Sequence, residues 1–416
     1  MKLPGSSHFT SMCKSKRSTI VVPPSIRNRN RQPQRSRTST PSSSTTSDVP
    51  ITESRSYIYG DKEWSNSSSI SSHTSLTSLK HSLPENPHIY HFSEITAATV
   101  NFSGNRLSPS SWRCSLRSRD VVIFQRKLRR QIDLPDLPHR LAIICRSHHS
   151  SLVKLLGASI SGSYIYLVYE FTPGASLADC LRNRNNPSFT SLSTWTSRMQ
   201  IASDLAHGLD YVHNFSGSGS GFVHNHIKSS SIVVAEESLA ARICHFGTSE
   251  LCGEVVTGEP SSELRRSGSR NVRLEGTTGY MAPEFQASGV ATMKTDVYAF
   301  GVVVLELLSG EEAVRFEFGG DGGYRKVCVV ETAREAVEEH GGGVRLWVDK
   351  RLRDSFPVEV AEKMIRVGLG CVEEDPNERP DMGRVSNEVS KLYLESKKWA
   401  EKMGTNIDFS VSLAPR

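Results

Sequence analysis

The chain has 416 residues, 37% of them hydrophobic, and a formal net charge of +6. This length accommodates one large two-lobed domain plus an unstructured arm, and the hydrophobic fraction is low for a chain that packs throughout. Residues 1–47 hold nine Lys or Arg and no acid, so the remainder carries −3. This excludes a strongly basic folded domain, and it indicates that the arm could meet an anionic surface such as a membrane.

The spacing of the cysteines and the hydropathy of the chain indicate in which cellular compartment the protein is expected. The eight cysteines are scattered without short paired spacing, which is neither a disulfide framework nor a zinc pattern and fits a reducing compartment. No apolar run approaches the ~18 residues that span a bilayer, and residues 1–10 lack the apolar core of a signal peptide. We expect a soluble, cytoplasmic protein without specific nucleic-acid recognition.

Residues 1–86 are rich in Ser, Thr, Arg, Pro and Asn and have almost no apolar periodicity. Such a segment cannot bury enough apolar surface to offset its ordering entropy, which predicts a disordered arm. Its Ser and Arg content also fits an organelle transit peptide, and its charge fits peripheral contact with the plasma membrane. The simplest interpretation is a solvated linker rich in phosphoacceptors.

Folded structure is expected from residue 87 to 395, followed by a tail at 396–416. A short helix is predicted over His91–Thr99, with Ser93 as its cap, and strands over 121–124, 152–156 and 164–169. Apolar spacing of three and four predicts helices over 199–213 and 297–308. Strands first and helices afterwards predict an α+β fold, with a β-rich N-lobe at about 87–169 and a mostly helical C-lobe at about 172–395.

Three motifs occur in order in the second half: GTTGYMAPE (276–284), TDVYAFGV (295–302) and EDPNERPDM (374–382). They resemble the end of the activation segment, the following buried helix and the closing Arg motif of protein kinases. With Phe92–Thr99, they resemble the plant receptor-like kinases, and 296–301 is similar to the LysM-receptor group. The resemblance covers residues 91 to about 395. It implies a Glu284–Arg379 ion pair inside the large lobe and an Asp296 that holds the backbone of the catalytic loop.

The same resemblance marks the positions that would bind ATP, which needs a glycine-rich loop, a Lys–Glu pair, metal ligands and an acceptor for the hydroxyl proton. The loop reads LSPSSW (107–112), with Ser108 and Ser110 where glycines would let backbone N–H groups approach phosphate. Phe124 aligns with the phosphate-binding Lys and Arg140 with its Glu partner. Lys127 is a poor substitute, because an odd offset along a strand points to the opposite face. A Phe124–Arg140 cation–π contact is one possibility; the other is that Phe124 fills the cleft while Arg140 turns to solvent.

The catalytic loop reads VHNHIKSSSI (223–232). Aligned with the family, it places His226 at the proton-accepting Asp, Asn225 at the preceding Arg and Ser231 at the metal-binding Asn, and it retains Lys228. The metal-binding triplet reads His245-Phe246-Gly247. A neutral imidazole does not replace a carboxylate for Mg²⁺, which prefers hard anionic oxygens, so no magnesium site is expected. Tyr169 completes the set of degenerate cleft positions.

Two further interpretations concern the histidines and the activation segment. His226 and His245 would lie close together and could ligate zinc or copper, although two neutral, hydrogen-bonded histidines explain them more simply. The run RRSGSR (265–270) fits a substrate for basic-directed kinases, which makes Ser267 and Ser269 candidate phosphosites alongside Thr277. A solvated charge run explains the same residues.

We therefore interpret the chain as a pseudokinase that acts as a scaffold or allosteric partner of an active receptor-like kinase, with no cofactor expected. One alternative is an atypical Ser/Thr protein kinase with residual binding of ATP and Mg²⁺. Another is that the basic arm is the functional part and directs the protein to an organelle, a membrane or nucleic acid.

Overall fold

The computed structural model describes residues 87–129, 136–183, 185, 192–214, 221–254, 276–318, 322–339 and 342–404. The basic arm, the candidate phosphosites Ser267 and Ser269, and residues 405–416 lie outside the described residues. Within the described part of the chain, no helix combines the length and the apolar character needed to cross a bilayer.

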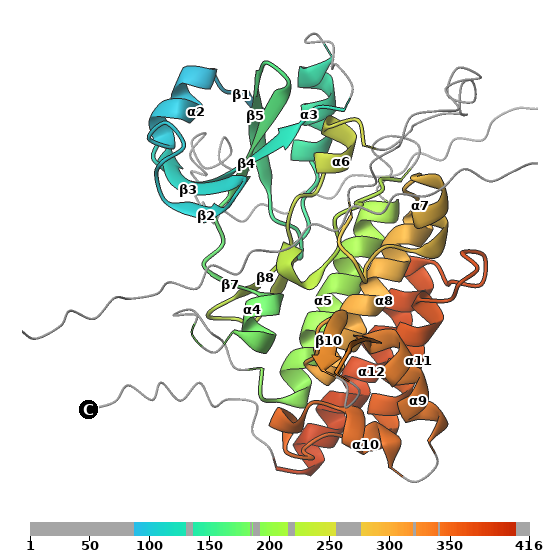
Figure 1. The fold of residues 1–416 in the computed structure, drawn as a ribbon. Helices are drawn as coiled ribbons and strands as arrows, with labels where there is room; N and C mark the ends of the chain where they lie inside the picture. The colour runs from blue at the N-terminus through green and yellow to red at the C-terminus, as the bar shows by residue number, and fades with distance from the viewer. Residues whose placement is uncertain are drawn as a thin grey trace, which may run out of the picture. The chain divides into compact units, whose positions relative to one another are not determined.

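The N-lobe is built on a six-stranded sheet in the order β1-β5-β6-β4-β3-β2 (Figure 1). Its strands are β1 (His88–Ile89), β2 (Arg106–Ser108), β3 (Ser111–Leu116), β4 (Arg119–Lys127), β5 (Leu155–Ser161) and β6 (Tyr164–Glu170). Neighbouring strands are antiparallel except for β1, which runs parallel to β5. The parallel pair requires close backbone contact, because a Cβ on Gly157 would lie 1.9 Å from the carbonyl oxygen of His88.

Helix α2 (Phe92–Ala98) packs its apolar side on this sheet. Ile95 is fully buried in a cluster that also contains Tyr90, Leu116, Val121, Ile123, Leu156, Tyr166 and Val168. The helix begins one residue after His91, whose backbone N–H donates to the Glu94 carboxylate at 3.1 Å. The prediction that Ser93 caps this helix is wrong, because the Glu94 side chain reaches back to the His91 N–H as in a capping box.

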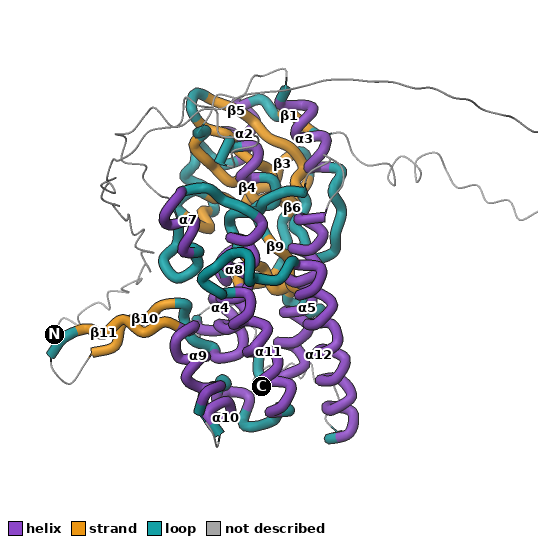
Figure 2. Tube along the Cα trace, turned by 90° about the vertical axis from the view of Figure 1, so that its right-hand side faces the viewer, coloured by secondary structure: helices purple, strands orange, loops and turns teal. Residues whose placement is uncertain are grey.

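The C-lobe is mainly helical (Figures 1 and 2). Its helices are α4 (Leu177–Arg182), α5 (Trp195–Asn214), α7 (Pro283–Ser288), α8 (Met293–Ser309), α9 (Val329–Glu338), α10 (Gly343–Trp347), α11 (Val358–Cys371) and α12 (Met382–Lys402), with 3₁₀ turns η2 (Ser229–Ser231) and η3 (Lys350–Leu352). The central helix α8 is apolar on most sides and buried from Val297 to Ser309 apart from Tyr298, as expected for a helix enclosed by others. It begins at the cap Thr292 and ends at Gly310, whose φ of 75° favours glycine.

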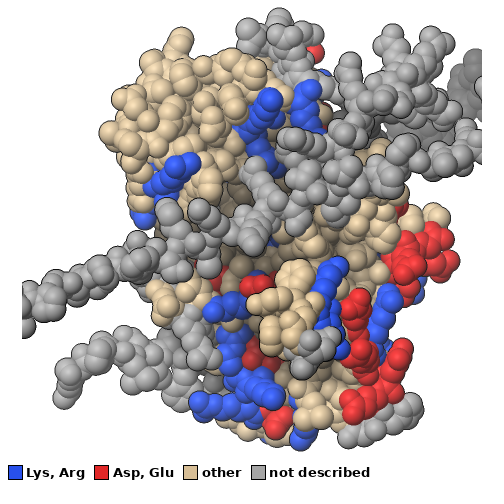
Figure 3. Space-filling view, in the orientation of Figure 1, with Lys and Arg blue, Asp and Glu red and all other residues tan. Residues whose placement is uncertain are grey.

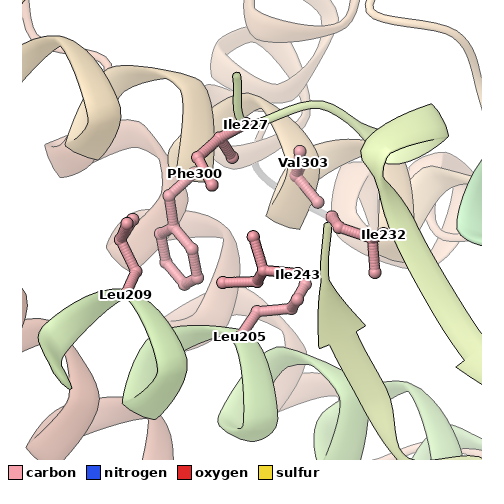
Figure 4. Close-up of a pocket in the computed structure, with 7 residues that line it drawn as sticks. All are labelled: Leu205, Leu209, Ile227, Ile232, Ile243, Phe300 and Val303. Carbon is pink, nitrogen blue, oxygen red and sulfur yellow. The ribbon is translucent and has the colours of Figure 1, made fainter. Parts of the chain in front are cut away.

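Two small sheets complete the C-lobe. The first contains β7 (Gly174–Ser176), β8 (Ile232–Ala235) and β9 (Ala241–Ile243), and it flanks the catalytic loop. The second is the hairpin β10 (Val314–Phe318) and β11 (Tyr324–Cys328). A small internal space beneath the catalytic loop is lined only by apolar side chains, as Figure 4 shows: Leu205, Leu209, Ile227, Ile232, Ile243, Phe300 and Val303. It therefore offers nothing to hold a nucleotide.

The α+β, two-lobed architecture expected from the sequence is confirmed. The predicted strands 121–124 and 164–169 lie within β4 and β6, and both predicted helices lie within α5 and α8. The third strand begins later than expected, at Leu155, while Leu152 forms only an isolated bridge with Ile243. Helix α12 continues to Lys402, so the boundary placed at residue 395 falls inside it.

Candidate active site

Asp296 of α8 holds the backbone of the catalytic loop. Its carboxylate accepts the backbone N–H of His224 at 2.6 Å and of Asn225 at 2.7 Å, and it lies 3.1 Å from Nε2 of His213. Asp296 is 1% exposed, so these bonds form away from water. They let the loop adopt a φ of +61° at Asn225, in the left-handed region that Asn tolerates better than most residues. The role that the resemblance implies for Asp296 agrees with this geometry.

The Glu284–Arg379 pair is present in the C-lobe. Arg379 donates from Nη1 to Oε1 of Glu284 at 2.6 Å and from Nη2 to Oε2 at 2.8 Å, which is a bidentate arrangement. The same guanidinium donates to the backbone carbonyls of Glu373, Glu374 and Lys294. The Arg379 side chain is fully buried, whereas that of Glu284 is 25% exposed. The pair therefore joins α7 to the segment before α12.

His226, at the aligned position of the proton acceptor, lies between two charged side chains that belong to none of the sequence motifs, Arg126 and Glu254. Its Nε2 is 2.8 Å from Oε2 of Glu254, and Nη2 of Arg126 lies 3.2 Å from its Nδ1. Arg126 also approaches Oε1 of Glu254 at 3.5 Å. Arg126 comes from β4 and Glu254 from the start of the activation segment, so the three side chains join the two lobes at the catalytic position.

Glu254 is ionised in this arrangement. Its side chain is 4% exposed. Burial, the largest single effect, would raise its pKa, but the hydrogen bond with His226 and the charges of His226, Arg126 and Arg129 together outweigh burial and lower the pKa to about 2. A backbone bond from Arg129 N–H to the Cys252 carbonyl, at 2.9 Å, holds the same segment against the end of β4.

Phe124, at the aligned position of the phosphate-binding Lys, packs on the His245 ring with centroids 4.2 Å apart. Arg126 lies two residues along β4 and therefore shares this face, and its guanidinium is 5.6 Å from the Phe124 ring. Lys127 is exposed. The suggested cation–π contact between Phe124 and Arg140 is not formed, because Arg140 turns instead to Glu250, with Nη1 and Oε1 3.4 Å apart.

Arg140 and Glu250 connect two helices beside the cleft, α3 (Leu137–Cys145) and α6 (Thr248–Leu251). The Arg140 side chain is 42% exposed, so its ion pair is a weak one. The helices meet closely at Gly247, where an added Cβ would lie 2.5 Å from Cγ2 of Ile144 and where φ is +82°. Glycine is therefore required at the last position of the His245-Phe246-Gly247 triplet.

His245 occupies the aligned position of a metal-binding carboxylate. Its φ is +69°, which is uncommon for a residue with a side chain and is maintained by its surroundings. Burial, reinforced by neighbouring positive groups, holds the pKa of His245 well below its usual value, so the ring is neutral. Its Nδ1 is buried and has no hydrogen-bond partner among the described residues. Ser231, the second aligned metal position, is 3% exposed.

The remaining predicted positions have local partners. Ser108 Oγ lies 2.7 Å from Ser111 Oγ, and the Ser110 N–H donates to Ser108 Oγ, so the loop serines bond to their own turn. Tyr169 donates from its hydroxyl to the Phe246 carbonyl at 2.9 Å, and burial raises its pKa. Within the described ranges, no group of three His, Cys, Asp or Glu side chains is arranged to hold a metal ion.

Lys228 keeps a contact with the activation segment, donating from Nζ to Oγ1 of Thr277 at 3.3 Å. Thr277 is exposed, whereas the nearby Tyr280 hydroxyl donates to the buried Glu306 carboxylate at 2.6 Å. The end of the activation segment is therefore tied both to the catalytic loop and to α8.

Arg126 was missed although the sequence contained a signal for it. It stands two residues after Phe124, and an even offset along a strand keeps a side chain on the same face. Glu254 had no such signal. It follows the metal-binding triplet by several residues, and only the folded path of the segment brings it to His226.

A comparison with known proteins shows to which protein family the chain belongs. Residues 117–389 match the family described as protein tyrosine and serine/threonine kinase. The chain belongs to the protein kinase family.

Its relatives are plant receptor-like kinases, and LysM domain receptor-like kinases are among them. The chain is 31% identical over 335 residues to "LysM domain receptor-like kinase 3" of Arabidopsis thaliana, covering 77% of this chain and 49% of that protein. It is 31% identical over 321 residues to "Protein LYK5" (75% and 44%) and 34% identical over 261 residues to "Chitin elicitor receptor kinase 1" (62% and 39%), both of Arabidopsis thaliana. The chain thus spans about half the length, or less, of these relatives.

Proposed function

We propose that this chain is a catalytically impaired protein kinase-like protein, a pseudokinase, which acts as a scaffold or allosteric partner in receptor-kinase signalling. The observation that carries the proposal is the placement of His226 between Arg126 and Glu254. A general base must reach the proton of a substrate hydroxyl, and here the imidazole is already engaged by a carboxylate and a guanidinium of its own chain.

The cleft residues also do not fit a magnesium-bound nucleotide. Mg²⁺ prefers anionic oxygen ligands in octahedral geometry, whereas a neutral His245 and the hydroxyl of Ser231 stand at the two aligned positions. Phe124 packs on His245 where the family places the lysine that binds phosphate. Near the catalytic position, the opposite charges of Arg126 and Glu254 lie 3.5 Å apart and offset each other.

Thermal unfolding of the full chain with and without ATP and Mg²⁺ tests this proposal. A ligand that binds only the folded state raises stability by mass action, by about 2.7 kcal/mol at a hundredfold excess over its Kd. We expect no metal-dependent rise in Tm. The proposal would be overturned by a clear, metal-dependent rise in Tm that disappears in the variant Val122→Phe. This substitution places a bulkier side chain on the side of β4 that faces the cleft.

The partner role has its own test. The purified chain is mixed with the active kinase domain of a receptor-like kinase, and phosphotransfer by that kinase is measured with and without the chain. We expect the chain to form a complex, to change the rate, and to be phosphorylated at positions that include Thr277, Ser267 or Ser269. The absence of both complex and rate change across several receptor-like kinase domains counts against a scaffold or allosteric role.

A second candidate function is an atypical Ser/Thr protein kinase. The retained contact between Lys228 and Thr277 supports it, because the end of the activation segment is still held against the catalytic loop. In this case the full chain transfers phosphate from ATP to a protein substrate, and both Lys228→Met and His226→Ala abolish the transfer. We expect no transfer above the level of these two variants.

A third candidate places the function in the basic arm, which would direct the protein to a membrane or organelle. Residues 1–86 carry the excess positive charge of the chain. Fusion of these residues to a fluorescent protein tests the idea, and a diffuse signal contradicts it.

A further inference from the structure

The hairpin β10–β11 carries three exposed aromatic side chains. Phe316 is 67% exposed, Phe318 is 70% exposed and Tyr324 is 76% exposed. Figure 2 shows the hairpin extending away from the helices of the C-lobe. Its two strands pair with each other and with no other strand in the described part of the chain. Exposed aromatic residues grouped on one projecting element mark an interaction site more often than scattered ones do.

The strand register places these aromatic residues on one face. Phe318 is paired with Tyr324, Phe316 with Lys326 and Val314 with Cys328, and residues paired across antiparallel strands share a face. The Phe318 and Tyr324 rings touch edge to face, with centroids 5.4 Å apart. We call this surface, formed by Val314, Phe316, Phe318, Tyr324 and Lys326, the aromatic face.

The opposite face of the hairpin is polar except at Val327. Val327 is buried, with 6% of its surface exposed. Arg315 Nε lies 2.8 Å from Oε1 of Glu317, and Arg325 Nη2 lies 3.6 Å from Oε2 of the same carboxylate. The alternation of apolar and polar residues in β10 is the pattern of a strand with one buried face. Here the more apolar face is the one left in solvent.

The charges on the hairpin bear on the kind of surface that it can bind. Residues 314–328 carry Arg315, Arg325 and Lys326 against Glu317 and Asp321, a net charge of +1. Arg315 and Arg325 approach the Glu317 carboxylate, and Arg315 also lies 3.3 Å from Glu311. Lys326 stands on the aromatic face itself, beside Phe316. Figure 3 shows both Lys or Arg and Asp or Glu side chains next to the uncharged surface in the region where Figure 1 places β10. Aromatic rings flanked by cations suit the boundary between headgroups and acyl chains of an anionic membrane.

We propose that the aromatic face of the β10–β11 hairpin docks on an anionic lipid bilayer. The area argues against a second copy of the chain. Three aromatic side chains of ~200 Å² each, about two-thirds exposed, offer roughly 400 Å², whereas a stable protein interface needs about 800 Å² from each partner. A bilayer has no fixed shape to match, and it accepts a small convex surface.

The depth of this contact is limited. The outer edges of a two-stranded sheet keep unpaired backbone groups, which are costly in hydrocarbon, so the hairpin lies at the interface and does not cross it. Helix α9 follows β11 directly and exposes Glu331, Glu335 and Glu338. Repulsion between these acids and anionic lipid keeps α9 away from the bilayer, so that contact is confined to the projecting hairpin. The proposal is independent of whether the cleft binds nucleotide.

Co-sedimentation of the full chain with vesicles tests the proposal. We expect binding to vesicles of phosphatidylcholine with phosphatidylserine at three to one, and weaker binding to phosphatidylcholine alone. The triple variant Phe316→Ser, Phe318→Ser, Tyr324→Ser is expected to weaken binding to the mixed vesicles about tenfold or more, because affinity scales with the apolar area buried. The basic arm is present in both proteins, so the difference between them reports the hairpin.

The matched control removes exposed apolar side chains elsewhere. Leu346 of α10 is 71% exposed and Leu394 of α12 is 56% exposed. The variant Leu346→Ser, Leu394→Ser should bind like the wild type. In a second readout, Phe318→Trp should add fluorescence that brominated phosphatidylcholine quenches beyond the wild-type level. Equal binding by the triple variant and the wild type, or no added quenching, overturns the proposal. A doubled mass in light scattering that the triple variant abolishes would assign the face to self-association instead.

Discussion

Charged residues have different kinds of partner in two regions of the molecule. One region is the set Glu284, Asp296 and Arg379 inside the C-lobe, which we call the frame; the other is the cleft between the lobes. In the frame, Asp296 and Arg379 bond the groups that the kinase resemblance implies: the backbone of the catalytic loop and the carboxylate of Glu284. In the cleft, His226 and Arg140 stand at aligned catalytic positions but pair with carboxylates of the activation segment. The residues that hold the C-lobe together are thus different from those that stand at the aligned catalytic positions, so the cleft residues can change while the C-lobe keeps its internal contacts.

The largest expected effect is the loss of stability on removing Arg379 from the frame. Replacing Arg379 by Met leaves Glu284 without its partner and three backbone carbonyls without a donor. We expect a loss of about 3–5 kcal/mol in the free energy of unfolding, measured by urea denaturation. The control Arg366→Met removes an exposed pair with Glu362 and should change stability by less than about 0.5 kcal/mol. Equal losses in the two variants contradict the comparison.

The second prediction tests the link between frame and catalytic loop. Asp296→Ala leaves the N–H groups of His224 and Asn225 buried and unpaired. We expect a loss of about 2–3 kcal/mol and faster amide hydrogen exchange at these two positions. If exchange in the loop does not change, Asp296 does not hold it.

The third prediction concerns the cleft and its dependence on pH. The pKa of Glu254 is lowered to about 2, so its contribution to stability is fully present above its ordinary pKa and is lost as the pH falls towards the folded value. Glu254→Gln should cost about 2 kcal/mol near neutral pH, and the difference from wild type should shrink between about pH 4.5 and pH 2. Urea denaturation across this range measures it. A difference that stays constant over the range contradicts an ionised Glu254 in the cleft.

The smallest expected effect is a difference in stability between two substitutions at Asn225, which measures the backbone strain at this position. Asn225 has a φ of +61°, a conformation that Gly adopts freely and that costs Ala about 1 kcal/mol. Asn225→Ala should therefore be less stable than Asn225→Gly by about 1 kcal/mol. The same pair of substitutions at the exposed, helical Asn387 of α12 should show the opposite order, because Gly is disfavoured inside helices.

Much of the fold was readable in the sequence. The runs that became β4, β6, α5 and α8 are long and strongly patterned, so their local preference agrees with their final environment. The errors fell where a side chain had more than one available partner. Ser93 is a good cap in isolation, but the reach of Glu94 to His91 starts the helix earlier. Of the two alternatives for Arg140, the cation–π contact with Phe124 is not formed; the side chain is 42% exposed and lies 3.4 Å from the Glu250 carboxylate, a partner that neither alternative included.

The sequence by itself determined the two-lobed fold, because its strands come first and its helices follow in strongly patterned runs. The roles of Asp296, Glu284 and Arg379 and the departures at the cleft positions are what the resemblance of short motifs to protein kinases implies. Only the tertiary structure decided what the replaced residues contact. Arg126 and His226 are 100 positions apart, and Glu254 reaches them from a third segment. Electrostatic interactions depend on distance in space and on burial, and neither can be read along a chain before the segments have folded together.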